Sequence, residues 1–550
     1  MAARTGGCRL TAETPRPRAA LAELATYTPG RTAAAVAAEH GLADAVKLAS
    51  NELAFGPLPS VTAAMAAAGA TANRYPDHRA VPVRVRIAEG LGVDVDWVSV
   101  GCGSVGLLQQ LTTAFAGPGD EIAFGWRSFE AYPVLTAVSG ASEVRSALRR
   151  FTLDPSAVSS SISPATRLVF LANPNNPTGT YLPASAIDRL LAEVPTNCLV
   201  VLDEAYREFV DHADAVDGVA LVESHPNVAV LRTFSKAYGL AALRIGYLIA
   251  RPEVVAAVDA VALPFAVNAI AQAAAVASLD DPAQAELRER VRTVRSERAR
   301  VARTLRGELG LGVPESEANF LWLPAGAATG ALGNALEKRG VVGRSLGEGV
   351  RVTIGTQIEN DRFIDALDDI QQSEPDALVS WGLATGDIAR NAQAWIDRAS
   401  AVEDRLTMLA ASRRSGRTAP DHGGEETWGD GEAWAHIAEF GGYWLRELGS
   451  VLTGSPADPP AFGRTKVDPV RRSAIADGAG REPLSQLAHA RRALATVRHL
   501  LAGLNGDEWG AAGRHSTLGL LDMDSILEEF LVGHYEQHAA QLETLAPSHG

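Results

Sequence analysis

The hydrophobic pattern of the chain changes near residue 375, and this change limits the folds that are open to it. Before that point, short β-branched runs alternate with amphipathic helical stretches, which is typical of an α/β fold with a parallel sheet. After it, long helical periods follow one another without strand patterns, which is typical of an all-α bundle. The composition changes at the same place, because eight of the 12 histidines and six of the nine tryptophans lie after residue 375. We therefore expect two modules with separate cores.

The overall composition restricts the class of protein further. With 47% hydrophobic and 21% charged residues over 550 positions, the chain is a folded protein. A formal charge of −15 argues against a nucleic-acid partner and against an anionic membrane surface. Three cysteines exclude a disulfide framework, and no apolar run reaches the ~18 residues of a membrane span. Residues 1–20 lack the apolar core of a secretory signal, so we expect a flexible arm there and a cytoplasmic protein.

Three apolar runs in the first module are each followed directly by a polar turn. The runs are Arg167–Ala172, Cys198–Asp203 and Val228–Leu231. The turns read NPNNPTG (173–179), DEAY (203–206) and TFSKAYGLAALR (233–244). Because open parallel sheets bind ligands at the carboxyl ends of their strands, we expect the three turns to meet at one crevice.

The third turn has the chemistry of a covalently bound aldehyde cofactor. Lys236 lies beside Ser235 and precedes Arg244 by eight residues, which suits an imine-forming amine next to an anchored phosphate. The glycine-rich segment Gly101–Gly106 would place a helix N-terminus on the same phosphate. Each piece alone has an ordinary explanation as a turn, a helix cap or a surface lysine. Their order along the chain favours function.

With these motifs, residues ~20–370 resemble the fold-type I pyridoxal-phosphate aminotransferases, in the branch of histidinol-phosphate and aromatic amino acid aminotransferases. The matching stretches are KLASNELAFGP (47–57), NRYPD (73–77), NPNNPTG, DEAY, RTFSKAYGLAALRIGY (232–247), ANFLWL (318–323) and VRVTIG (350–355). The resemblance implies an aminotransferase over 21–372. Its large domain would lie near 51–274, with a mostly parallel sheet. Its small α+β domain would be formed by segments near 21–50 and 275–372.

The family's roles can be transferred to matching positions of this sequence. Lys236 would hold pyridoxal phosphate and move the substrate proton, and Asp203 would pair with the protonated pyridine nitrogen. Asn176 and Tyr206 would hydrogen-bond the phenolic oxygen, so that Lys236, Asp203 and Tyr206 form the catalytic set. Residues for the phosphate and for the stack on the ring follow from the same comparison. They are Ser104, Thr233, Ser235 and Arg244 for the phosphate, Phe129 for the ring, and Tyr75 from a second subunit.

The same resemblance implies an amino acid and a 2-oxo acid as substrates and a homodimer as the assembly. Arg351 would form a bidentate pair with a substrate carboxylate. Arg344, Tyr27 and Asn51 would complete the substrate site. Val105 departs from the acidic residue that many relatives carry after the glycine-rich loop, so that phosphate contact would come from backbone N–H groups.

Two substrates are compatible with the sequence. The segments GCGSV, FGWRSFEAYP and SNELAFGPLP favour transamination of aromatic L-amino acids with 2-oxoglutarate. The alternative is histidinol-phosphate transamination, because an arginine can bind a phosphate as well as a carboxylate. A decarboxylase on the same fold and a pyridoxal-phosphate-regulated effector are weaker alternatives.

The second module is predicted to be a four-helix bundle over 377–545. The expected helices are Ser380–Ala411, Glu432–Leu452, Pro483–Leu504 and Met523–Leu545, with a long connection at Gly454–Gly480. His534 and His538 share one helix face at spacing i, i+4, and His436 lies on another helix. Three imidazoles could hold Zn²⁺ or Ni²⁺, although such a pair is more often a solvated face. His489 and His499 are expected at the surface.

Trp428, Glu432 and His436 match the W-x-x-x-E-x-x-x-H pattern of the DinB-like four-helix bundles, and HYEQHAAQL (534–542) matches their H-x-x-x-H pattern. This second resemblance implies a divalent metal held by His436, His534 and His538. It leaves two functions open: a metal-dependent thiol transferase or hydrolase, and a purely structural bundle.

Overall fold

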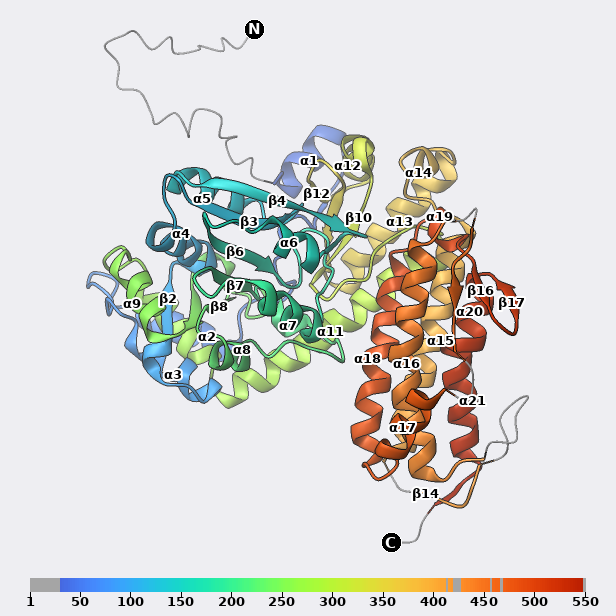
Figure 1. Ribbon diagram of the computed structural model, residues 1–550. Coiled ribbons are helices and arrows are strands. Elements are labelled where there is room, and N and C mark those ends of the chain that lie inside the picture. The colour runs from blue at the N-terminus through green and yellow to red at the C-terminus, as the bar shows by residue number, and fades with distance from the viewer. Residues whose placement is uncertain (1–29, 412–413, 419–426, 456–457, 465–467, 548–550) are drawn as a thin grey trace.

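The computed structural model describes residues 30–411, 414–418, 427–455, 458–464 and 468–547 (Figure 1). The expected arm over residues 1–20 and Tyr27 lie outside these ranges. None of the described helices is long and apolar enough to cross a membrane.

An eight-stranded mixed sheet forms the centre of the first module. In spatial order its strands are β2 (Val98–Gly101), β9 (Gly246–Ala250), β8 (Val228–Thr233), β7 (Leu199–Asp203), β6 (Thr166–Ala172), β3 (Glu121–Trp126), β4 (Ser142–Arg149) and β5 (Thr152–Leu153). The five strands from β8 to β4 run parallel, whereas β9 is antiparallel to both of its neighbours. The three strands expected from the apolar runs are therefore confirmed as neighbours in one sheet.

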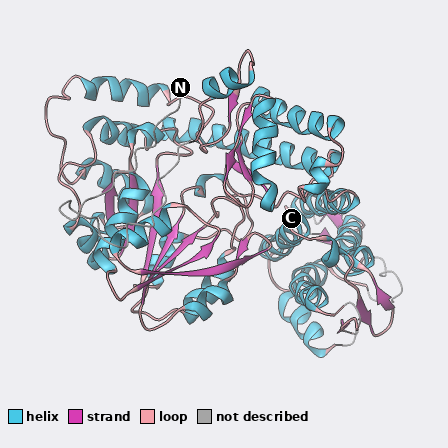
Figure 2. Cartoon of the chain, turned by 90° about the horizontal axis from the view of Figure 1, so that it is seen from above, coloured by secondary structure: helices cyan, strands magenta, loops and turns pink. Residues whose placement is uncertain are grey.

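Helices cover both faces of this sheet, as Figure 2 shows from above. One face packs on α4 (Gly103–Phe115), α5 (Ala131–Ser139) and α9 (Pro252–Ala260). The other packs on α2 (Pro59–Gly69), α3 (Val81–Leu91), α7 (Ala184–Glu193), α8 (Gly218–Ser224), α10 (Ala269–Ser278) and α11 (Asp281–Arg303). Leu168 and Phe170 point to the first face, and Val169 and Leu171 to the second. Because side chains alternate along a strand, a β6 that is apolar throughout is buried on both sides.

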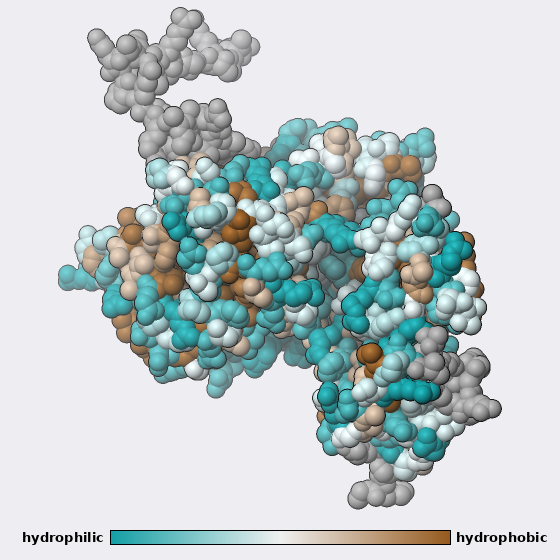
Figure 3. Space-filling view, viewed as in Figure 1, coloured by the Kyte–Doolittle hydropathy of each residue, from teal (hydrophilic) through white to brown (hydrophobic). Residues whose placement is uncertain are grey.

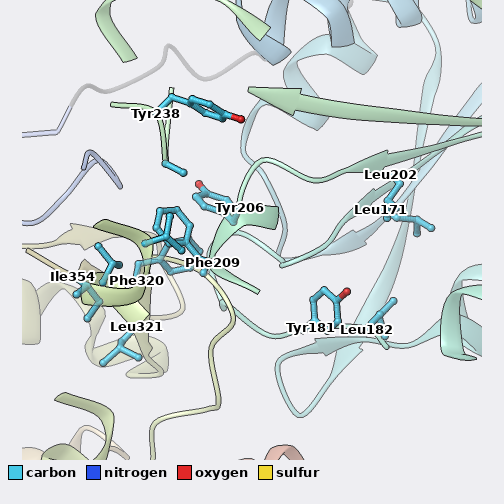
Figure 4. Packing of buried hydrophobic residues seen from close by; sticks show 14 of the residues in the cluster. Leu171, Tyr181, Leu182, Leu202, Tyr206, Phe209, Tyr238, Phe320, Leu321 and Ile354 are labelled. Atoms are coloured by element: carbon cyan, nitrogen blue, oxygen red, sulfur yellow. The ribbon is translucent and has the colours of Figure 1, made fainter. Parts of the chain in front are cut away.

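The small domain is built around a three-stranded antiparallel sheet. The sheet contains β10 (Phe320–Leu323), β13 (Val350–Thr353) and β12 (Arg344–Ser345). Near it lie β1 (Val46–Lys47), β11 (Val341–Val342), α1 (Ala33–His40), α12 (Thr329–Lys338) and α13 (Gln357–Ser373). Phe320 and Ile354 of this domain belong to the same apolar cluster as Tyr206 and Phe209 of the large domain (Figure 4). This shared core sets β13 beside the carboxyl ends of the central strands.

The second module is a helical bundle with its own hydrophobic core (Figure 1). Its main helices are α15 (Asp387–Leu409), α16 (Asp430–Thr453), α18 (Pro483–Ala502), α20 (Met523–Phe530) and α21 (Val532–Glu543). The four expected helices are present, although the first begins only at Asp387 rather than at Ser380 and the last is broken at Leu531, where the backbone is not helical. Short strand pairs also occur in the loops of the bundle, which the sequence pattern did not predict. They are β14 (Arg414–Ser415) with β18 (Ala546–Pro547), and β15 (Ala461–Phe462) with β16 (Gly513–His515) and β17 (Gly519–Leu521).

The expected long connection Gly454–Gly480 contains a helix, α17 (Pro469–Gly478), that packs on α16. Asp468 caps α17 by accepting hydrogen bonds from the backbone N–H groups of Val470 and Arg471, and Pro469 stands at its first position. Its mixed Arg/Ser/Ala composition shows no clear helical period, so this helix within the long connection was not expected from the sequence.

The first core extends beyond the expected boundary at residue 377. Leu378 of α14 (Ala377–Ser380) and Leu383 are buried in the core of the first module, and Ala384 forms a backbone bridge to Leu311. The bundle core begins only at Ala392. Apolar side chains near 380 find their partners on the preceding module, which periodicity alone cannot distinguish.

The two modules touch through polar contacts. Arg150, at the tip of the β4–β5 hairpin, forms an ion pair with Glu508 at 2.6 Å. Oγ1 of Thr152 lies 3.0 Å from Nε2 of His499, so His499 contacts the first module and the expectation of a surface position is wrong. His489 is exposed, as expected. Arg306 of the first module donates to the Gln393 side chain of α15. The bundle is therefore docked on the first module.

Candidate active site

The three polar turns line one cavity of about 410 Å³ at the carboxyl ends of β6, β7 and β8. Because β7 lies between β6 and β8, Asp203 stands between Asn176 on one side and Lys236 on the other. The small domain contributes Arg344 and Arg351 to the same cavity. The crevice predicted from the parallel strands is thus present in the folded chain.

Lys236 is the candidate nucleophile of this cavity. Its Nζ donates to the backbone carbonyl of Ser50 at 3.2 Å. Burial, with help from the cations Arg351 and Arg244, lowers the pKa of Lys236 to about 7, although Glu52 and Asp203 act in the opposite direction. A lysine with this pKa is largely neutral above pH 7, and only the neutral amine can attack an aldehyde.

Asp203 lies at the floor of the cavity and is 5% exposed. Its Oδ2 accepts a hydrogen bond from the hydroxyl of Tyr132 at 3.0 Å. Its Oδ1 is also buried, and no side chain of a described residue donates a hydrogen bond to it. Burial raises the pKa of Asp203 to about 6, so a cation is needed to hold the carboxylate form firmly. A protonated pyridine nitrogen is such a cation, and the open Oδ1 fits its N–H.

Tyr206 and Asn176 line the cavity together with Asp203, and hydrogen bonds link both to the small domain. Asn51 donates from Nδ2 to the hydroxyl of Tyr206 at 2.9 Å, and the backbone of Asn51 is bonded to Thr353 of β13. Arg351, also on β13, donates to the side-chain oxygen of Asn176 and to the carbonyl of Ala49. Asn51 has a φ of 54°, in the left-handed region that asparagine tolerates better than most residues. The small domain therefore positions both polar side chains.

The expected phosphate residues converge at the start of α4. Ser104, Thr233, Ser235 and Arg244 all line the cavity, and Nη1 of Arg244 donates to Oγ of Ser235 at 3.2 Å. Gly103 has a φ of 72°, and a Cβ atom there would lie 2.5 Å from Nη2 of Arg244. Only glycine lets the guanidinium cross the first turn of α4, where backbone N–H groups are unpaired. A phosphate fits this cradle of N–H groups and one guanidinium.

Phe129 and Arg344 line the cavity, whereas Tyr75 was expected to reach it only from a second subunit. Phe129 is half-buried and packs edge-on against Tyr132, with ring centroids 5.6 Å apart. Arg344 forms an ion pair with Glu130 at 3.2 Å. Tyr75 is 83% exposed, is stacked on Phe265 and does not line the cavity of its own chain.

Sequence reasoning missed two groups that set the chemistry of the cavity. Tyr132 holds Asp203, and the Ser50 carbonyl accepts from Lys236. The only available signal for Tyr132 was its position three residues after Phe129, at the start of the helix α5 (Ala131–Ser139). A backbone carbonyl such as that of Ser50 leaves no signal in side-chain identity.

The three histidines that were expected to form a metal site lie close together in the bundle. The candidate ligand atoms of His436, His534 and His538 all lie within 4.8 Å of one another. Nε2 of His534 is 3.4 Å from Nε2 of His436 and 3.1 Å from Nε2 of His538. Nδ1 of His538 lies 2.7 Å from Oε1 of Gln541, a partner that sequence reasoning did not name. Burial and the two neighbouring imidazoles hold the pKa of His436 well below its usual value.

Comparison with known proteins places the first module in a family. The family model of the class I and II aminotransferases matches residues 43–367. An aromatic amino acid aminotransferase of Thermobifida fusca (strain YX) is 50% identical over 348 residues, which cover 63% of this chain and 95% of that protein. One of Streptomyces coelicolor is 48% identical over 360 residues, which cover 65% and 98%.

Solved structures agree with the sequence comparison. Histidinol-phosphate aminotransferase from Sinorhizobium meliloti, in complex with pyridoxal-5′-phosphate, has a TM-score of 0.59 and 28% identity, and covers 66% of this chain and 99% of that one. The chain belongs to the class I and II aminotransferase family, and its first module has the fold-type I architecture of pyridoxal-phosphate-dependent aminotransferases.

Proposed function

We propose that the first module transaminates aromatic L-amino acids of the phenylalanine and tyrosine type with 2-oxoglutarate, giving an aryl-pyruvate and L-glutamate. The observation that carries the proposal is the pair formed by Lys236, with its lowered pKa, and Asp203, with its open Oδ1, at the wall of one cavity. The aromatic substrate rests on the relatives of 48% to 50% identity that carry that activity in their names.

Pyridoxal phosphate, when bound, supplies the electron sink that makes the substrate's Cα–H bond acidic. Lys236 would carry the proton to and from that carbon, because its amine is neutral near pH 7. Asp203 would hold the pyridine nitrogen, and Tyr206 and Asn176 the phenolic oxygen. The phosphate would lie against Ser104, Thr233, Ser235 and Arg244, and Phe129 would cover the ring face.

Arg351 is the candidate anchor for the substrate carboxylate. It is 8% exposed and lies 5.5 Å from the centre of the Phe320 ring, so its guanidinium is held in one place within the cavity. Arg344 is the second candidate, and Asn51, which also lines the cavity, donates to the hydroxyl of Tyr206. Tyr27 keeps its proposed role from the sequence alone, as does the cytoplasmic location.

The alternative substrate is histidinol phosphate, which the neighbouring structure of that name favours at lower identity. An assay of the holoenzyme separates the two. We expect phenylalanine to bleach the visible absorption of the bound cofactor and 2-oxoglutarate to restore it, with a kcat/KM for phenylpyruvate at least equal to that for imidazole-acetol phosphate. A kcat/KM that strongly favours the imidazole phosphate would make the alternative the correct substrate.

We also propose that the module works as a homodimer in which Tyr75 reaches the phosphate of the partner subunit. Tyr75, Leu263 and Phe265 are 83%, 75% and 40% exposed. On the face shown in Figure 3, hydrophobic residues also reach the surface on the left flank of the module, around α3 and α9. Large apolar side chains exposed together favour burial against a second copy.

For the bundle we propose a Zn²⁺ or Ni²⁺ site formed by His436, His534 and His538, in a DinB-like fold. A tetrahedral ion with bonds of ~2.0–2.1 Å separates its ligand atoms by about 3.3 Å, close to the Nε2 distances of 3.1 and 3.4 Å. Gln541 would orient His538, as partners of metal-bound imidazoles do. Open positions on the ion would suit a thiol transferase or hydrolase.

Metal analysis of the purified protein tests this site. We expect one bound ion per chain in the unaltered protein and none after His534→Ala with His538→Ala. His489→Ala is the matched control, because His489 is exposed on α18. Protein that binds no ion after growth with zinc and nickel would leave the bundle with a structural role.

A further inference from the structure

A second and larger cavity lies on the other side of the residues that follow β7 and β8. Its volume is about 820 Å³. Its walls come from the C-terminal end of α3, the N-terminal half of α11, the 3₁₀ turn Arg207–Phe209 and the strand β9. None of the described residues that line this cavity also lines the cofactor cavity. The two are separate sites of one domain.

Arginine dominates the charge of this second cavity. Two acidic residues, Glu208 and Asp281, line it. The cationic residues that line it are Arg86, Arg207, Arg232, Arg288, Arg292 and Arg295. Five of these six arginines also pair with carboxylates that do not line the cavity, so an anion would be attracted mainly by Arg288 and by the N–H groups that those pairs leave open.

Internal partners do not satisfy all of these arginines. Arg232 is 4% exposed, donates from Nε to Glu204 at 2.7 Å and also interacts with the hydroxyl of Tyr247, which lines the same cavity. Arg295 binds Asp211 at 3.2 Å and the carbonyl of Glu208 at 3.0 Å, while its Nε is buried without a described acceptor. A buried donor without an acceptor is unfavourable, so a ligand oxygen at Arg295 would satisfy it.

One face of α11 presents further recognition groups. Gln284, Arg288, Val291 and Arg295 follow one another at spacings of three and four residues, so all lie on the face that borders the cavity. Arg288 is exposed and forms no ion pair with a described residue.

Apolar side chains complete the walls. Ile87 and Leu91 of α3 and Leu287 of α11 line the cavity beside the arginines. A ligand with a carbon skeleton as well as anionic groups would contact both kinds of surface.

The segments that line the two cavities are adjacent in the chain. Arg207 directly follows Tyr206, and Tyr238 lies two residues after Lys236. Tyr206 and Tyr238 belong to the same apolar cluster, in which Figure 4 labels them. A ligand in the second cavity would therefore contact the segments that carry the catalytic side chains.

We propose that this cavity is a binding site for a small organic anion with two or more carboxylate or phosphate groups, distinct from the cofactor and substrate cavity. Guanidinium groups match both kinds of oxyanion with paired N–H donors. Such a ligand carries more negative charge than an aromatic substrate, which has a single carboxylate.

Isothermal titration of the holoenzyme with citrate, and separately with pyrophosphate, tests the site. We expect saturable binding of at least one probe with one site per chain, weakening as ionic strength rises. The Arg288→Glu substitution should raise the Kd of the bound probe at least tenfold, because it replaces an exposed cation of the cavity lining by an anion. Arg189→Glu is the matched control, since Arg189 is an exposed arginine on α7 that lines neither cavity, and should bind like the unaltered protein. The tighter probe would show whether carboxylate or phosphate is preferred.

Three results would overturn the site: binding of neither probe, an equal loss in Arg288→Glu and Arg189→Glu, or a loss in Arg351→Ala that exceeds the loss in Arg288→Glu. The last would place the anion in the substrate cavity. Because these titrations do not depend on turnover, an active aminotransferase that binds neither probe would refute this site and leave the proposed function intact.

Discussion

The two modules each bury a cluster of basic side chains, but they balance the charge in different ways. Around Lys236, burial and two arginines lower the pKa, whereas Glu52 and Asp203 partly compensate. Around His436, burial comes first, and the neighbours that add to it are His538, His534, Arg471 and Arg464, all of them basic. The first cluster can exchange a proton near neutral pH. In the second cluster, His436 is held in the neutral imidazole form, which is the form that binds a metal.

The clusters also arise differently from the sequence. The first collects side chains from the ends of three strands and from β13, so its members lie far apart in the chain, as Asn176 and Arg351 do at a separation of 175 residues. The second needs one i, i+4 pair on α21 and one histidine on α16. An enzyme site built on a sheet therefore depends on tertiary contacts more than a site built on paired helices.

Removal of Lys236 should have the largest effect and should be confined to the first module. We expect Lys236→Ala to lose the visible absorption of bound cofactor and at least ~10³-fold in kcat, because both the covalent anchor and the base are lost. Lys338→Ala, at an exposed lysine of α12, should behave like the unaltered protein. Turnover that persists in Lys236→Ala would refute the assignment of this residue.

Asp203→Asn keeps the shape of the side chain and removes its charge. A hydrogen bond to a charged group is worth about 1.5–3 kcal/mol, so kcat/KM should fall by about 10- to 150-fold. Tyr132→Phe removes only the hydroxyl that donates to Oδ2 and should cost less. An equal loss in both variants would mean that Tyr132 does more than hold Asp203 in place.

The pH dependence of cofactor loading measures the charge balance around Lys236. Below its pKa of about 7 the amine is protonated, so the rate at which the visible absorption appears in apoenzyme should fall about tenfold per pH unit and should level off above pH 7. Arg351→Ala removes a cation that lowers this pKa and should move the midpoint to higher pH. A midpoint near the usual lysine value of ~10.4 would contradict the described environment.

The contact between the modules should give the smallest effect. Arg150 and Glu508 pair with side chains that are 19% and 20% exposed, so Glu508→Ala should destabilise the docked arrangement by less than about 1 kcal/mol. In thermal unfolding, we expect the difference between the Tm values of the two modules to be larger in Glu508→Ala than in the unaltered protein. Glu543→Ala, which breaks the Arg405–Glu543 pair within the bundle, is the control and should leave that separation unchanged.

Much of the candidate active site could be predicted from the sequence, because its signals are local. The runs at 167–172, 198–203 and 228–231 are apolar on both faces, and the polar turns follow them directly, so the positions of Asn176, Asp203 and Lys236 follow from the rule for parallel sheets. The i, i+4 spacing of His534 and His538 is equally local. The helix α17 was not predicted because its periodicity is weak, and it is defined mainly by its N-terminal cap and its packing on α16.

By itself, the sequence determined the two kinds of module, three neighbouring strands of the central sheet, the main bundle helices and the chemical type of each candidate residue, since periodicity and turn chemistry act over a few residues. Only the tertiary structure decided that Tyr132 holds Asp203, that Ser50 accepts from Lys236 and that six arginines share one cavity. It also decided that His499 faces the first module rather than water. These contacts join residues distant in the chain, and the burial that shifts the pKa values of Lys236 and Asp203 exists only once those residues have packed together.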